Sequence, residues 1–103
     1  MTPEELRAFV LGLEGAVEGS HQGGPDFRRA GRIVVNLDEL QRTITIKLDT
    51  DEQAALVDAD PTAYSLPGGW ARHGWTTISL DHANPDEIRE LVTQAWDSTP
   101  RRH

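Results

Sequence analysis

The residues best suited to bind a charged ligand are five cationic side chains near the middle of the chain. Between residues 27 and 48 the sequence places Arg28, Arg29, Arg32, Arg42 and Lys47. Asp38 and Glu39 oppose them there, so this segment carries a charge of +3 in a chain whose formal net charge is −7. Arginine and lysine bind phosphate and carboxylate groups through charge-assisted hydrogen bonds. The segment is therefore predicted to form an anion-binding face, or else the solvated face of an acidic protein.

Two tryptophans lie close to further cations in a later segment. Trp70 and Trp75 flank Arg72 and His73, and aromatic rings beside cations can stack on nucleic-acid bases for about 1–3 kcal/mol per base. The same rings could instead pack against one end of a sheet and bury a large area. Both interpretations also apply to Tyr64, which lies in the same segment. The predicted nucleic-acid-binding set comprises Arg28, Arg29, Arg32, Arg42, Lys47, Arg72, Trp70 and Trp75.

A different set of residues could surround a small molecule. His21 followed by Asp26 has the composition of an acid–base pair, and Arg28 and Tyr64 could complete a ligand pocket. No obvious nucleophile accompanies them, so His21 is better explained as a surface residue or a packing residue of a loop. The four histidines show no i, i+4 pair and the chain has no cysteine, which argues against a metal site. The sequence thus favours a binding domain over an enzyme and predicts no metal, cofactor or catalytic residue.

Length and charge set further limits. At 103 residues the chain fits one domain, predicted to span residues 1–99 and to be followed by a disordered tail at 100–103. The net charge of −7 opposes general binding to nucleic acid or anionic membranes. No apolar run approaches the about 20 residues of a membrane span, and the acidic N-terminus is unlike a secretion signal. We expect a cytoplasmic protein without a membrane partner; no oligomeric state is indicated.

Three helices are predicted from capping residues and apolar periodicity. Thr2 and Glu5 form a capping box, and the apolar stripe that follows predicts a helix ending near residues 13–14. A second helix is expected after Thr50 as its cap, and a third after Asn84. Trp96 lies on the apolar stripe of the third helix and is predicted to be a core residue.

Strands are predicted at residues 17–21, 27–30, 32–37, 42–48 and 75–80. Ala30-Gly31 is a tight turn between two of them, and Ile44 and Ile46 alternate with polar residues toward the core. Residues 61–74 lack any period, which is typical of a functional or compact surface loop. The order α-β-β-β-β-α-β-α predicts an α+β fold, with an antiparallel sheet of four to five strands and helices packed on one face.

Several short segments also occur in a characteristic order along the chain. They are Leu13-Glu14-Gly15, Val17 to His21, Gly24 to Arg28, Arg32 to Val34, Ile46 to Leu48, Asp51 to Leu56, Pro61 to Tyr64, Gly69-Trp70, Gly74 to Thr76, Glu87 to Val92 and Ala95-Trp96. Together they resemble the MmcQ/YjbR family of small bacterial proteins, from about residue 11 to the C-terminal tail.

The resemblance implies a frataxin-like or secretion-chaperone-like fold, in which helices lie on one side of a twisted antiparallel sheet. It also implies DNA binding through a pair of wings, here the turns at Ala30-Gly31 and at residues 38–41. The second turn carries Asp38 and Glu39, which would repel phosphates, so we expect weak and salt-sensitive DNA binding. A recurring lysine and a recurring tryptophan of the family are matched by Lys47 and Trp75. The chaperone-like architecture implies a protein partner as the alternative, bound by the same sheet face.

Overall fold

The computed structural model describes residues 1–21 and 24–99, with the backbone alone described at His21. The helices are α1 (Pro3–Leu11), α2 (Thr50–Ala59), the short 3-10 helix η1 (Gly68–His73) and α3 (Pro85–Asp97). The strands are β1 (Val17–His21), β2 (Gly24–Arg29), β3 (Arg32–Asp38), β4 (Thr43–Lys47), β5 (Tyr64–Ser65) and β6 (Trp75–Ser79). The predicted tail at 100–103 lies outside the described residues.

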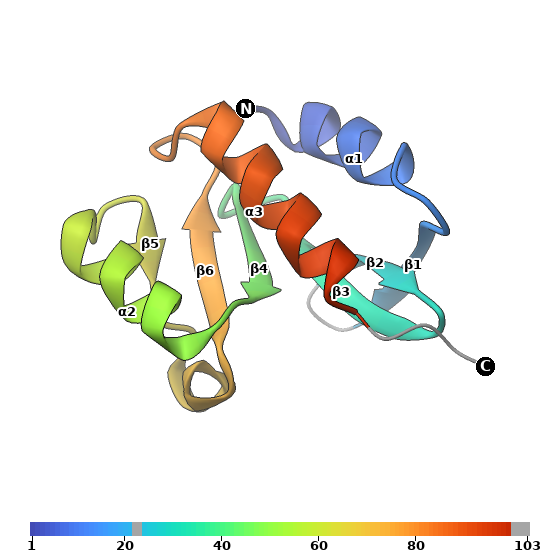
Figure 1. Cartoon of the computed structure of the whole chain (residues 1–103). Helices are drawn as coiled ribbons and strands as arrows, with labels where there is room; N and C mark the ends of the chain where they lie inside the picture. Colours follow the sequence, from blue (N-terminus) through green and yellow to red (C-terminus); the bar gives the residue numbers. More distant parts are fainter. Residues whose placement is uncertain (22–23, 100–103) are drawn as a thin grey trace.

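The strands form one six-stranded antiparallel sheet in the order β1-β2-β3-β4-β6-β5 (Figure 1). The predicted α+β class is confirmed, but the expected four to five strands are too few. The strand that the sequence did not predict is β5, whose two residues pair with β6 in the middle of the unpatterned loop. Two residues are too few to show any alternation, so periodicity could not reveal it.

Alternation along the central strands builds the core. Ile44 pairs with Leu37 on β3 and with Ile78 on β6, and all three side chains are buried. Helices α1 and α3 cover this face of the sheet, and α2 lies at the side of β5 and β6 (Figure 1). Trp96 is buried in this core and donates its indole N–H to the backbone oxygen of Glu14 at 2.8 Å. The predicted core role of Trp96 is therefore confirmed.

The helix ends differ in two places from those predicted. Thr2 and Glu5 form the predicted capping box of α1, but the helix ends at Leu11 and not at residues 13–14. Glycine costs about 1 kcal/mol in a helix interior, and Gly12 closes α1 by donating its N–H to the last carbonyls. The cap of α2 is Asp49 and not Thr50, because the Asp49 carboxylate accepts the backbone N–H of Asp51, the second residue of the helix, at 2.9 Å.

A β-bulge in β3 changes which way its first residues face. Phe27 on β2 pairs with Val35, whereas the next residue pairs with Ile33, so Val34 is an extra residue without a partner on β2. Val34 and Val35 are consequently both buried under the helices. A bulge bends its strand and re-aims the side chains beyond it. Arg32, at the start of β3, is thereby carried toward the C-terminal end of α3.

Candidate functional site

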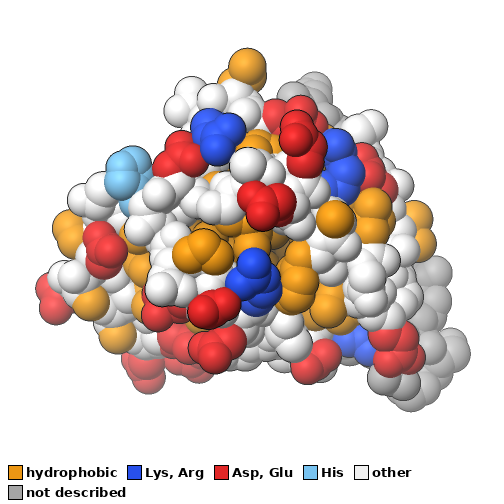
Figure 2. All heavy atoms as spheres, turned by 90° about the horizontal axis from the view of Figure 1, so that it is seen from above, with side chains coloured by type: hydrophobic (Ala, Val, Ile, Leu, Met, Phe, Trp, Pro, Cys, Tyr) orange, Lys and Arg blue, Asp and Glu red, His pale blue; other side chains and the backbone are white. Residues whose placement is uncertain are grey.

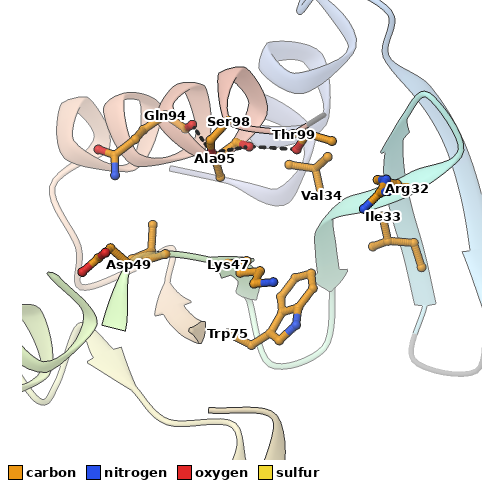
Figure 3. A pocket seen from close by; sticks show the side chains of 11 residues that line it. Arg32, Ile33, Val34, Lys47, Asp49, Trp75, Gln94, Ala95, Ser98 and Thr99 are labelled. Atoms are coloured by element: carbon orange, nitrogen blue, oxygen red, sulfur yellow. Dashed lines mark hydrogen bonds between the residues drawn. The ribbon is translucent and has the colours of Figure 1, made fainter. Parts of the chain in front are cut away.

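A pocket of about 630 Å³ opens beneath the last turn of α3, between the diverging ends of β3 and β4 (Figure 3). Its walls come from the start of β3, the end of β4, the start of β6 and the end of α3. The main lining residues are Arg32, Val34, Lys47, Leu48, Trp75 and Ala95. We call this hollow the strand-gap pocket. Its volume lies within the range of about 300–1,000 Å³ that is usual for small-molecule sites.

The pocket exists because β3 leaves β4 early. The pairing of these strands begins at Val35 and Ile46, although β3 itself begins at Arg32. The preceding part of β3 pairs with β2 instead, and the bulge at Val34 bends it away. Side chains from both faces of the sheet therefore line one gap. Buried Val34 contributes from the helix-covered face, and Lys47, which follows inward-facing Ile46, contributes from the other.

Trp75 is held in the pocket wall by two backbone features. The backbone N–H of Leu48 donates to the oxygen of Gly74 at 2.8 Å, which fixes the end of β4 against the start of β6. Gly74 has φ 95°, and a Cβ at that position would lie 2.1 Å from the oxygen of Leu48. Only glycine fits this contact. Trp75 consequently pairs with Lys47 across β4 and β6.

A buried amide supports the same wall from α2. Gln53 donates its side-chain N–H groups to the oxygen of Trp75 at 2.8 Å and to that of Ala71 at 3.1 Å. Its side chain thus ties η1 and the start of β6 to α2. Periodicity missed this role, because a glutamine near a helix start is normally exposed. The sequence offers no signal for this role, because Gln53 directly follows four other polar residues at 49–52.

Three of the predicted cations are already engaged within the protein. Arg28 on β2 forms a two-point contact with Asp26, at 2.8 Å from Nε and 3.1 Å from Nη2. This hydrogen bond and the charge of the buried Asp26 side chain raise the pKa of Arg28. Arg42 makes a similar contact with Asp81, with Nη2 at 2.9 Å from the carboxylate. Both guanidinium groups are therefore neutralised by neighbouring carboxylates.

Arg29 is engaged in a different way. Its side chain is buried and donates from Nη1 to the backbone oxygen of Trp96 at 2.7 Å, at the end of α3. A cation at a helix C-terminus is stabilised by the helix dipole. Because neighbouring residues of a strand face opposite sides, Arg28 and Arg29 do not share one surface. Arg29 therefore has a structural role in this fold.

Arg32, Lys47 and Arg72 form no ion pair with a carboxylate in the described part of the chain. Arg32 and Lys47 are both exposed and both line the strand-gap pocket, on β3 and β4 respectively (Figure 3). Arg72 lies in η1, outside the pocket lining, and its Nε is 3.3 Å from the His73 ring. The structure thus brings Arg32, Lys47 and Trp75 together.

The tryptophans and Tyr64 have different surroundings. Trp70 is 68% exposed in η1, whereas Trp75 is half-buried in the pocket wall. Tyr64 is buried, and its hydroxyl donates to the carboxylate of Glu87 on α3. Burial, and then the hydrogen bond to Glu87, raise the pKa of the Tyr64 phenol. Tyr64 is therefore a packing residue that fastens the β5 loop to α3.

The alternative pocket of His21, Asp26, Arg28 and Tyr64 is not assembled. Asp26 and Arg28 lie on β2, while Tyr64 lies on β5 with three strands between them. Tyr64 also pairs with inward-facing Ile78, so its ring points to the covered face of the sheet. The backbone of His21 on β1 pairs with that of Gly24 on β2, and the side chain of His21 lies outside the described part of the structure.

The other surfaces of the described residues show no comparable grouping. Figure 2 shows the side of α1 and α3, where acidic and basic side chains are interspersed around a shallow hollow. Residues 1–21 and 24–99 hold no group of three or more His, Cys, Asp or Glu side chains that could bind a metal ion. Within the same ranges, no helix has the length and apolar character needed to cross a membrane.

Comparison with known proteins identifies the family. The YjbR family model matches residues 11–98. A solved structure, the Deinococcus radiodurans protein DR2400 with its DUF419 domain, superposes with a TM-score of 0.81 and 19% sequence identity. The match covers 92% of this chain and 75% of that one, and at this identity it shows a shared fold. No curated protein matches the sequence. The predicted resemblance is confirmed, and this chain belongs to the YjbR family.

Proposed function

We propose that the chain is a non-enzymatic binding domain and that the strand-gap pocket is its anion-binding site. The observation that supports this most directly is the position of Arg32 and Lys47. Both lack a carboxylate partner within the described residues, and both line one pocket beside Trp75. An arginine already paired with a carboxylate gives up its hydrogen bonds when it binds a ligand, whereas an unpaired one does not.

Binding fits this pocket better than catalysis. Among its lining residues Asp49 is the single carboxylate, and neither histidine nor cysteine is present. The hydroxyls of Ser98 and Thr99 also line the pocket, but they donate to backbone oxygens of α3. The described lining residues therefore lack a nucleophile activated by a neighbouring base, which is the usual sign of covalent catalysis. The acidic remainder of the chain repels anions, so attraction would be confined to this end of the sheet.

Chemical-shift mapping with inorganic phosphate tests the proposal. We expect the backbone amide signals of residues 32–34, 47–49 and 75 to shift in a saturable way. The matched variants Lys47→Gln and Arg72→Gln remove one positive charge each, from inside and outside the pocket. Lys47→Gln should weaken the response and Arg72→Gln should not. The proposal fails if no signal shifts, or if the shifts cluster around residues 28 and 42.

Single-stranded nucleic acid is the second candidate ligand, favoured by the exposed ring of Trp70 beside Arg72. Three cations without carboxylate partners could neutralise about three phosphates, so the slope of log K against log salt should be about −2 for single strands. Five contacts, as the sequence predicted, would give about −3.5. Titration of a labelled oligonucleotide at several salt concentrations distinguishes the two slopes. The absence of binding at low salt would exclude this ligand.

A further inference from the structure

We infer that the strand-gap pocket takes an amphipathic organic anion, with one carboxylate, sulfonate or phosphate head and a flat apolar body. This inference rests on the proposed anion-binding function and adds the class of ligand. It follows from the presence of two cations without carboxylate partners and of a largely apolar lining in one pocket. Neither feature alone would specify such a ligand.

The lining of the pocket is largely apolar, although Gln94, Ser98 and Thr99 at the end of α3 add polar atoms to it. Val34, Leu48 and Ala95 are almost fully buried behind the lining, so the apolar surface that a ligand could cover belongs mainly to the half-buried side chains of Ile33 and Trp75. A small hydrated ion such as phosphate leaves such a surface in contact with water and gains nothing from it. An apolar body that replaces this water gains free energy in proportion to the area it covers. The lining therefore favours an organic ligand over an inorganic one.

The cationic groups belong to the exposed part of the pocket lining. Arg32 on β3 faces the gap from one side, and Lys47 on β4 faces it from the other (Figure 3). Both side chains are exposed, so an anionic head held between them stays partly solvated. Asp49 also lines the pocket, directly beyond the end of β4. Its carboxylate would repel a second negative charge on that side, which favours a ligand with one anionic head.

Trp75 favours a flat ligand body. Its ring lies next to Lys47 in the wall and is half-buried, so one part of it is covered by protein and another part faces the gap (Figure 3). A planar group can stack on such a ring. The contacts through Gly74 and Gln53 fix the backbone at Trp75 before a ligand arrives. A preorganised wall lowers the entropic cost of binding.

Fluorescence titration with three probes tests the inference. The probes are 1-anilinonaphthalene-8-sulfonate, its uncharged counterpart N-phenyl-1-naphthylamine, and inorganic sulfate. We expect one saturable site for the sulfonate. The uncharged amine should bind at least about ten-fold weaker, because it lacks a hydrogen bond to a charged group that is worth about that factor. Inorganic sulfate, followed by its competition with the sulfonate, should also bind at least about ten-fold weaker, because it lacks the apolar body. Arg32→Gln and Lys47→Gln should each weaken sulfonate binding about ten-fold, and Arg72→Gln should leave it unchanged. A thermal unfolding curve for each variant confirms that it is folded.

The possible outcomes separate the inference from the function on which it rests. If inorganic sulfate binds as tightly as the naphthalene sulfonate and both depend on Arg32 and Lys47, the anion site stands and the amphipathic ligand is wrong. If the uncharged amine binds as tightly as the sulfonate, or if nothing binds, both are wrong. If Arg72→Gln weakens sulfonate binding and Lys47→Gln does not, the binding site lies elsewhere. Both the inference and the proposed function are then wrong.

Discussion

Replacement of Gly74 by alanine should destabilise the protein far more than replacement of other glycines in the same loop. The new Cβ would lie 2.1 Å from the oxygen of Leu48, well inside a normal carbon–oxygen contact of about 3.3–3.6 Å. Gly74 also has φ 95°, and a left-handed conformation costs a residue with a Cβ about 1–2 kcal/mol. The clash must separate the two chain segments and break the Leu48–Gly74 hydrogen bond, worth about 0.5–1.5 kcal/mol.

We therefore expect Gly74→Ala to lower the free energy of unfolding by at least about 2–3 kcal/mol. In a chain of this size, that corresponds to a fall in Tm of more than about 10 °C. Urea unfolding followed by circular dichroism measures the difference. Because Trp75 would move with the backbone, ligand binding in the strand-gap pocket should also be lost under conditions where the variant remains folded.

Two neighbouring glycines provide matched controls that separate backbone strain from steric clash. Gly68 has φ 69°, but a Cβ added there would have no atom within 4 Å, so Gly68→Ala should cost about 1–2 kcal/mol. Gly69 has neither a positive φ nor a close neighbour, so Gly69→Ala should change stability by less than about 0.5 kcal/mol. If Gly74→Ala is no more destabilising than Gly68→Ala, a steric clash at Gly74 is excluded.

Three further predictions concern other parts of the chain. Ala30 has φ 52° in the β2–β3 turn, so Ala30→Asn, which creates an Asn-Gly turn, should stabilise the protein by about 0.5–1 kcal/mol in urea unfolding; a loss of stability would contradict this. Gln53→Leu leaves two backbone carbonyls without their donor and should cost about 1–3 kcal/mol by thermal unfolding, whereas an unchanged Tm would exclude the role assigned to the amide. Hydrogen bonds from Thr2 lower the pKa of Glu5 below its ordinary 4.5. The contribution of the ionised Glu5 carboxylate to the stability of the protein is therefore present above pH 4.5 and is lost as the pH falls through the lowered pKa. Glu5→Gln should therefore flatten the decline of stability in acid, and an unaltered pH profile would argue against the capping box.

The sequence predicted those parts of the fold in which local chemistry and tertiary packing agree. The capping box at Thr2 and the alternation around Ile44 determine an element from neighbouring residues alone, and both predictions are confirmed. Trp96 was recognised for the same reason, because its helical stripe is continuous. The strand β5 was missed, because its two residues are fixed by pairing with β6 and carry no local pattern.

The candidate site was harder to predict, because it depends on which residues meet across the sheet. The sequence grouped Arg28, Arg29 and Arg32 by proximity, but strand alternation and the bulge at Val34 send them to different places. The tertiary fold also determines which arginines pair with a carboxylate, since the partner of Arg42 is Asp81, which is 39 residues away in the sequence. Lys47 and Trp75 were identified individually, and only the register of β4 with β6 places them side by side.

The central claim is that two cations in one pocket, and not the overall charge, bind the ligand. Isothermal titration of the naphthalene sulfonate into two charge-matched double variants tests it most directly. Arg32→Gln/Lys47→Gln removes the pair that lines the pocket, and Arg72→Gln/Arg89→Gln removes two positive charges outside it. We predict that the first variant loses binding and that the second retains the affinity of the unmodified chain. Equal losses in both, or binding that survives in the first, would contradict the claim.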